Sequence, residues 1–453
     1  MSNGLTVVGG GLAGTEAAWQ AASRGVDVTL YEMRPEIQTG AHTAPFLAEL
    51  VCSNSLGSNL DNRASGVLKA EMRKLDSLLM ACADANAVAA GSALAVDREA
   101  FASMVTDKVE NHPNINVMRT EKRTIPDGPT IIASGPLSSQ SICNSISDML
   151  GTDHLYFYDA LSPIVYADTI DMSVAFKASR YQLGDETNGD YINCAMNEEQ
   201  YEQFVTGLLQ GDRIPLREFE KDIESGVLAG SHRYFEGCLP IEILAERGRE
   251  ALAYGPMRPV GIMSPHDGKR PYAVVQLRRD NLAGTLYNIV GFQTNLKWPE
   301  QKNVLRMIPG LGQARFARYG MMHRNTFINA PKALYETLQS RARSDLFFAG
   351  QITGVEGYAG NIATGLLAGI NITRYINGEK PLVVPRTSMI GALCHYVANA
   401  DPDTFQPMKA NFGLFPSLQP PINKKKWSKL ERYTLYSQRA LETVETLQYQ
   451  ENL

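Results

Sequence analysis

The chain has 453 residues, of which 44% are hydrophobic and 20% charged, a composition that fits a globular protein of two or three domains. Its six cysteines are widely scattered without a C-x-x-C pair, which argues against a zinc site or a disulfide scaffold and favours a reducing cytoplasm. Taken alone, the net charge of −5 argues against binding of nucleic acid. We predict no metal site, no membrane contact and no stable protein partner.

The first forty residues carry the clearest motif. An apolar strand over 5–8 is followed by a G-x-G-x-x-G turn, an alanine-rich helix over 15–24 and a second strand over 26–31 that ends at Glu32. This order is typical of a dinucleotide-binding unit, in which the helix N-terminus faces the phosphates and the acid accepts the ribose hydroxyls. The sequence therefore predicts a cofactor that contains ADP.

The glycines of this turn have separate steric roles. Gly9 permits the tight turn, Gly11 lets a pyrophosphate approach the backbone, and Gly14 lets the helix pack on the strand. The cofactor-binding residues predicted in this region are Gly9, Gly10, Gly11, Leu12, Ala13, Gly14 and Glu32.

The next stretch is rich in loops and places Cys52 among small polar residues. A structural cysteine more often lies in an apolar run, so Cys52 is a candidate reactive thiol. Hydrophobic periodicity then predicts one amphipathic helix over 64–83, a further helix over 99–111, and strands over 116–118 and 130–133.

From about 141 to 325 the pattern becomes antiparallel. Strands over 272–277 and 285–292 flank a turn and predict a hairpin. Residues 211–350 hold 20 basic and 14 acidic side chains, a net +6, which leaves 23 and 34, a net −11, elsewhere. Local patches of charge set the potential that a polyanion meets, so this basic region keeps nucleic acid a candidate partner. Cys238 lies just before a predicted helix over 241–247, whose dipole favours a thiolate.

A second strand–glycine–helix junction follows near residue 350. A buried strand over 346–350 ends at glycine and leads into a helix over 362–376. A lone NAD site needs no such distant return of the chain, so the junction favours FAD. The contacts predicted here are Gly350, Gln351, Thr353 and Gly354.

These patterns predict an α/β fold in three parts. A Rossmann-like FAD-binding domain of the glutathione-reductase type is formed by 1–140 and 326–380, and an α+β domain is inserted over 141–325. A basic C-terminal extension over 381–453 packs on the FAD domain. Within it, Lys424, Lys425 and Lys426 precede Trp427, a pattern that suits RNA contact, although a solvated helix end fits it equally well.

Five segments together resemble the folate- and FAD-dependent tRNA (uracil-5-)-methyltransferase family along nearly the whole chain. They are the glycine turn with 31–35, the two cysteine motifs over 49–55 and 235–242, and the stretches 322–326 and 350–358. The resemblance adds Arg34 to the predicted cofactor contacts. It implies formation of 5-methyluridine at position 54 of the tRNA T-loop. It also implies methylenetetrahydrofolate as carbon donor, and reduced FAD, recharged by NAD(P)H, as reductant.

This chemistry explains the presence of two cysteines. Uracil C5 is a poor nucleophile, and a thiolate that adds at C6 enables C5 to attack an electrophilic methylene. We assign Cys238 to the attack on C6 and Cys52 to proton removal or capture of an intermediate, with the two roles exchangeable. His323 is a candidate to stack on the pterin. The candidates for tRNA phosphates are Arg315, Arg318, Arg324 and the three lysines at 424–426.

Three rival interpretations stay open at this level. A related flavin-dependent family modifies the tRNA wobble uridine, but its chains are longer at the C-terminus. An FAD-dependent oxidoreductase without RNA substrate explains the flavin site alone. A non-catalytic flavin- and RNA-binding protein leaves Cys52 and Cys238 without a role.

Overall fold

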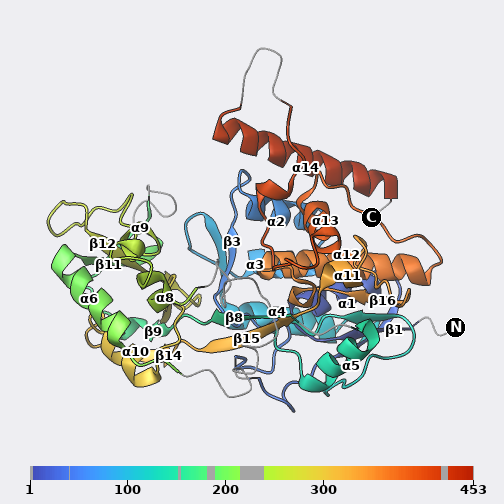
Figure 1. Cartoon of the computed structure of the whole chain (residues 1–453), viewed down its shortest axis with the longest axis horizontal. Coiled ribbons are helices and arrows are strands. Elements are labelled where there is room, and N and C mark those ends of the chain that lie inside the picture. Colours follow the sequence, from blue (N-terminus) through green and yellow to red (C-terminus); the bar gives the residue numbers. More distant parts are fainter. Residues whose placement is uncertain are drawn as a thin grey trace.

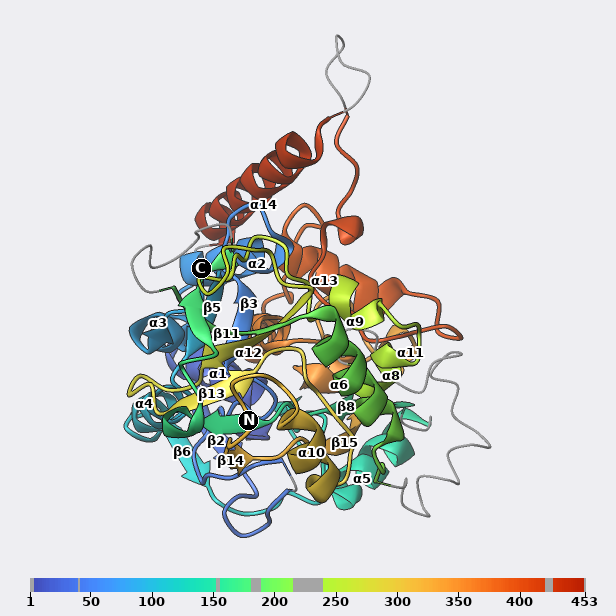
Figure 2. The ribbon, with the colours of Figure 1, turned by 90° about the vertical axis from the view of Figure 1, so that its left-hand side faces the viewer.

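The computed structural model describes residues 4–39, 41–151, 155–180, 189–214, 239–419 and 427–451, without the side chains of 155–160 and 322–324. Figure 1 shows two bodies side by side, with the N- and C-terminal parts of the chain in one and the middle of the chain in the other. The view from the side in Figure 2 places the middle of the chain in front of the parallel sheet. Among the described helices, none has the length and apolar character needed to cross a membrane.

A parallel sheet of five strands organises the larger body. Its strands are β1 (Gly4–Val8), β2 (Asp27–Tyr31), β6 (Ile115–Met118), β7 (Thr130–Ile132) and β16 (Leu346–Phe348). Their order is β16-β7-β1-β2-β6, and every neighbouring pair is parallel. The strand order reverses at β1, because β2 and β6 follow on one side and β7 and β16 on the other. Such a switch point leaves a crevice outside the carboxyl ends of the strands, where ligands bind in folds of this kind.

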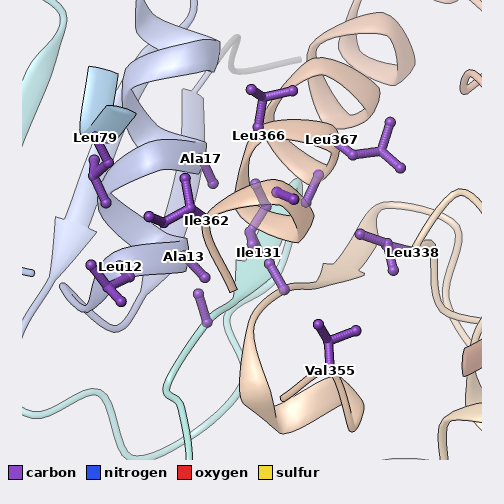
Figure 3. Packing of buried hydrophobic residues seen from close by; sticks show 14 of the residues in the cluster. Leu12, Ala13, Ala17, Leu79, Ile131, Leu338, Val355, Ile362, Leu366 and Leu367 are labelled. Atoms are coloured by element: carbon purple, nitrogen blue, oxygen red, sulfur yellow. The ribbon is translucent and has the colours of Figure 1, made fainter. Parts of the chain in front are cut away.

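Two helices from opposite ends of the chain pack together behind this sheet. They are α1 (Leu12–Ala22) and α12 (Tyr358–Ile376). A Cβ on Gly365 of α12 would lie 2.2 Å from the carbonyl oxygen of Ala13, and one on Gly369 would lie 2.6 Å from that of Ala17. Figure 3 shows α1 and α12 in contact, with Ile131 of β7 beside them. Glycine in α12 therefore brings the two strand–glycine–helix junctions close together.

The smaller body is built on an antiparallel sheet of six strands in the order β10-β11-β12-β13-β9-β14. The strands are β9 (Ile164–Tyr166), β10 (Phe176–Ala178), β11 (Tyr191–Met196), β12 (Ala273–Arg279), β13 (Leu286–Ile289) and β14 (Phe316–Arg318). The helices of this body are α6 (Glu198–Gln210), α8 (Ile241–Ala245), α9 (Ala251–Tyr254), α10 (Trp298–Leu305) and the 3-10 turn η1 (Ala167–Thr169). β12 and β13 form the predicted hairpin.

Shorter elements link and cover the two sheets. The connecting ribbon consists of β8 (Leu155–Ala160) and β15 (Met322–Phe327), which pair in antiparallel fashion. A small sheet contains β3 (Ser55–Ser58), β4 (Ala87–Val88) and β5 (Ala93–Val96). The remaining N-terminal helices are α2 (Ala64–Lys74), α3 (Leu78–Ala85), α4 (Arg98–Glu110) and α5 (Gln140–Leu150).

The C-terminal part of the chain packs on the larger body. Its elements are α11 (Ala330–Ala333), η5 (Gln351–Thr353), α13 (Met389–Asn399), η6 (Phe412–Leu414) and α14 (Lys429–Glu451). α14 lies along α2 and buries Tyr436, Ala440, Val444 and Leu447 in the same hydrophobic core as the parallel sheet. A separate core, from Val165 to Ala314, fills the smaller body.

The fold class predicted from the sequence is confirmed, with a Rossmann-like parallel sheet and an antiparallel insertion. One element was predicted wrongly, because the helix expected over 64–83 is two helices. Asp76 adopts a left-handed conformation with φ +54°, and the Ser77 hydroxyl accepts a hydrogen bond from the N–H of Met80 to cap α3. Capping by serine outweighs an apolar periodicity that runs through the break. The first helix begins at Leu12, three residues before its predicted start.

Candidate functional site

A cavity opens at the carboxyl ends of the parallel strands. Its empty volume is about 970 Å³, including space open to solvent. Both glycine junctions contribute to it, because Gly9 and Gly11 line one part and Gly350 and Gln351 another. The predicted cofactor residues that line the cavity are Gly9, Gly11, Leu12, Ala13, Glu32, Arg34, Gly350 and Gln351. The structure thus unites two segments that lie more than 330 residues apart.

The first junction has the geometry that its glycines predict. Gly9 has φ +108°, and a Cβ there would lie 2.4 Å from the carbonyl oxygen of Ala133. A Cβ on Gly14 would lie 1.8 Å from the carbonyl oxygen of Gly9. In contrast, a Cβ on Gly11 would meet no atom within 4 Å. Gly11 therefore faces open space at the N-terminus of α1, where an anionic group gains from the helix dipole and free N–H groups.

Four other predicted contacts do not line the cavity but shape its walls. The N–H of Gly10 donates to Glu32 Oε2 at 2.9 Å, and Gly14 packs α1 on β1. Thr353 Oγ1 donates to the carbonyl oxygen of Gly350 at 2.7 Å, and Gly354 adopts φ +82° against Phe405. These residues hold the two turns in place.

Glu32, Arg34 and Glu49 form a buried ionic network on the cavity wall. Arg34, with 1% of its surface exposed, contacts Glu32 Oε1 and Glu49 Oε2, each at 2.9 Å. Burial acts to raise the pKa of Glu32, but the charge and hydrogen bonds of Arg34 and the N–H of Gly10 lower it overall. The Glu32 carboxylate therefore anchors the glycine turn as well as facing the cavity, and the network orients this side of the site.

We expect Arg34→Met to destabilise the fold by about 3–5 kcal/mol, because it leaves two buried carboxylates without their cation. The lowered pKa of Glu32 contributes stability above the unfolded-state pKa, and this contribution is lost as pH falls through the folded-state value. Removing Arg34 lifts the folded-state pKa, so the stability of the variant should fall less steeply than that of wild type as the pH drops below the unfolded-state pKa. Urea unfolding between pH 4 and 8 measures both effects. An acid limb that superimposes on that of wild type would contradict this role.

The cavity also contains an unsatisfied polar atom. Asn361, in the first turn of α12, lines the cavity and is 8% exposed, and its Oδ1 has no hydrogen-bond partner among the described residues. A buried acceptor without a partner is costly unless a ligand or water supplies the donor. Open space at Gly11, a helix N-terminus and this acceptor are a combination that fits an elongated dinucleotide such as FAD.

The loop that carries Cys52 lies next to this cavity. Its neighbour Val51 and the ring of Tyr358 both line the cavity. The Tyr358 hydroxyl accepts hydrogen bonds from the N–H groups of Cys52 at 2.7 Å and Ser53 at 3.2 Å. Burial, and then the negative charge of Cys52, raise the pKa of Tyr358, so this hydroxyl stays protonated at neutral pH. The start of α12 is thus tied directly to the first cysteine motif.

Three arginines hold the same loop through its backbone and Asn54. Arg98 Nη1 donates to the carbonyl oxygen of Leu50 at 3.0 Å, and Arg98 also pairs with Asp280. Arg278 Nε donates to Asn54 Oδ1 at 2.9 Å. Arg318 of β14 donates to the carbonyl oxygens of Val51 at 3.0 Å and Cys52 at 3.1 Å. These contacts join the loop to both bodies of the molecule.

The sequence predicted Arg318 as a contact of a tRNA phosphate, and this prediction is wrong. Its guanidinium is engaged by the Cys52 loop, whereas Arg315 has a side chain that is 61% exposed and pairs with Asp168 at 2.8 Å. The spacing of Arg315 and Arg318 in the sequence does not show which of them faces the Cys52 loop. The pairing of β14 with β9 in the structure shows it.

The structure describes several of the predicted site residues only in part or not at all. Cys238 and the lysines at 424–426 lie outside the described residues. His323 and Arg324 lie on β15, but their side chains are also outside the description. After Cys238, α8 spans five residues and is shorter than predicted, which weakens the dipole argument. Glu242 in this motif is buried and accepts hydrogen bonds from Thr294 Oγ1 and the N–H of Asn295.

Sequence reasoning missed Arg98, Arg278 and Asn361. Arg98 occupies the first position of α4, a pattern that predicts only a helix start. Arg278 stands within an otherwise buried strand, where a charged residue signals a polar partner, so it was open to detection. Asn361 follows the glycine junction closely enough that the motif itself pointed to it.

Comparisons with known proteins agree with this geometry. A model of the family described as glucose inhibited division protein A (GIDA) matches residues 4–380. The chain is 55% identical over 441 residues to the methylenetetrahydrofolate--tRNA-(uracil-5-)-methyltransferase TrmFO of Anoxybacillus flavithermus, covering 97% of this chain and 98% of that one. It is 53% identical over 443 residues to the TrmFO of Bacillus subtilis, covering 98% of each.

Among solved structures, the fold is similar to that of Aquifex aeolicus GidA. The TM-score is 0.66 at 16% identity, over 98% of this chain and 73% of that one. At this identity the comparison shows a shared fold.

Proposed function

The chain belongs to the TrmFO family, and on this premise we propose that it transfers the carbon of methylenetetrahydrofolate to C5 of a uracil in tRNA. The observation that carries the proposal is identity above 50% along nearly the entire length of sequences named TrmFO. The local geometry supports it, because Cys52 is held beside a cavity that suits a dinucleotide.

FAD is the cofactor that we assign to the cavity, and when bound and reduced it supplies a hydride. Gly9, Gly11 and the N-terminus of α1 would bind the pyrophosphate, and Glu32 would face the ribose. Gln351 and Asn361 would contact the distal part of the cofactor. Two separate hydrophobic cores support a division into an FAD-binding domain and an inserted domain, although Ile142 and Ile146, which the predicted division 1–140 with 326–380 around 141–325 assigns to the inserted domain, pack in the core of the larger body.

The two cysteines would carry the covalent chemistry. The Cys238 thiolate would form a bond to uracil C6, and the resulting carbanion at C5 would attack the methylene carbon, so that one of the two bonds from this carbon to folate nitrogens breaks. Removal of the C5 proton, a step that we assign to Cys52, would expel the folate by breaking the second of these bonds and leave an exocyclic methylene on the uracil. A hydride supplied by the reduced cofactor would convert this methylene to a methyl group as the Cys238 thiolate leaves C6, which restores the ring. The target base must leave its stack to reach the thiol.

Finer details of the proposed function also rest on membership of the TrmFO family. The resemblance implies position 54 of the T-loop and NAD(P)H as reductant. The five described cysteines are not in disulfide bonds, which suits a reducing compartment such as the cytoplasm. The stretch 211–350, at a net +6, suits a polyanionic partner.

The purified yellow protein, incubated with unmodified tRNA, NADPH and methylenetetrahydrofolate labelled in its methylene carbon, should place label in 5-methyluridine. Digestion to nucleosides and chromatography measures this product. A transcript with cytidine in place of uridine 54 should stay unlabelled. Label at the wobble position would favour the rival tRNA-modifying family. NADPH oxidation without any label in RNA would favour a flavin oxidoreductase.

A further inference from the structure

Arg318 differs from the other charged side chains around Cys52. It belongs to β14, an edge strand of the inserted sheet, yet its guanidinium donates to two successive carbonyl oxygens of the loop, those of Val51 and Cys52. These residues are more than 260 positions away in the sequence. A planar guanidinium can form both bonds at once, which fixes the direction of the backbone at the cysteine.

The charges around Cys52 are predominantly positive. Arg278 and Arg318 both interact electrostatically with Cys52, and Arg318 stays charged at neutral pH because burial lowers its pKa only to about 10. Asp280 is the acid of this cluster among the described residues, and Arg98 pairs with it at 3.0 Å. The remaining titratable neighbour, Tyr358, is neutral and donates no charge. Positive charge near a thiol favours its thiolate form.

Arg318 also retains a donor that the loop does not use. Its Nε is buried and has no hydrogen-bond partner among the described residues. Arg98, by comparison, directs Nε and Nη2 at Asp280 and is therefore largely neutralised. Arg318, unlike Arg98, has no ion pair with a carboxylate among the described residues, although Asp280 acts on it electrostatically.

We propose that Arg318 is a positioning residue of the inserted domain that holds the Cys52 loop beside the cavity and stabilises the Cys52 thiolate. The use of the Cys52 thiol in this proposal rests on the proposed function. The contact between Arg318 and the Cys52 loop does not depend on it. Ionisation breaks the S–H bond and releases the proton to solvent, and Arg318 stays protonated throughout. The inserted domain thereby completes the site of the FAD domain, so that Cys52 is reactive only when the two are docked.

The rate of alkylation of Cys52 by iodoacetamide, followed from pH 5 to 10 by peptide mass spectrometry on the FAD-loaded enzyme, tests the charge effect. Arg318→Met should move the pH midpoint upward by about one unit and slow labelling at pH 7 about tenfold. Arg315→Met, three residues earlier, removes an exposed charge that pairs with Asp168 and should leave the profile unchanged. A midpoint in Arg318→Met equal to that of wild type would overturn the proposal.

Arg318→Lys separates charge from geometry and guards against a variant that fails to fold. Lysine keeps the charge, so the midpoint should stay near the wild-type value. It cannot make the paired bonds to both carbonyl oxygens, so methyl transfer should fall about tenfold with FAD content retained. Full methyl transfer in this variant would refute the positioning role. Because alkylation needs neither tRNA nor folate, its outcome is independent of whether the methyltransferase activity is found.

Discussion

Replacing Cys238 with alanine is expected to reduce methyl transfer at least about a thousandfold, because we assign to this thiolate the bond to C6 that activates C5. FAD should remain bound, since both glycine junctions, which line the cavity, are unchanged in this variant. Labelled product and absorbance at 450 nm measure the two effects on the same sample.

Cys194→Ala provides the matched control for the loss of a thiol in the inserted sheet. Cys194 is fully buried in β11, and burial raises its pKa to about 12, so it is inert at neutral pH. Its replacement should cost some stability but no activity. If Cys238→Ala kept substantial activity, the nucleophile would have to be Cys52, and the two roles would be exchanged.

Gly11→Val is expected to yield a folded protein without flavin. A Cβ at this position meets no protein atom within 4 Å, so the apoprotein should melt within a few degrees of wild-type apoprotein. It does project into the space at the N-terminus of α1, where we place the pyrophosphate, so affinity for FAD should fall at least about a hundredfold. Flavin content after purification and titration of apoprotein with FAD measure the loss.

Two further variants calibrate this result. Gly14→Ala places a Cβ 1.8 Å from the carbonyl oxygen of Gly9, so it should destabilise the fold itself. Gly312→Val, at an exposed turn of the inserted body, should affect neither property. A yellow Gly11→Val protein with the wild-type flavin content would place the cofactor elsewhere.

Much of this protein is readable from local sequence. The glycine turns, the hairpin of β12 and β13 and the return of the chain near residue 350 depend on neighbours in sequence, because turn geometry and strand alternation are local properties. The reactive setting of Cys52 was also indicated by its polar surroundings. The helix break at Asp76 and Ser77 was equally local, but capping competed there with a periodicity that pointed the other way.

Tertiary structure decided how the site is assembled. The contacts of Tyr358 and Arg318 with the Cys52 loop join residues that are 306 and 266 positions apart. In the sequence, Arg318 resembled a surface cation, and only these contacts indicate its role at the loop. Long-range contacts of this kind depend on the strand order and docking of two sheets, which no local pattern specifies. The sequence by itself determined the cofactor turn and the candidate thiols, whereas packing determined which side chains hold a thiol beside that turn.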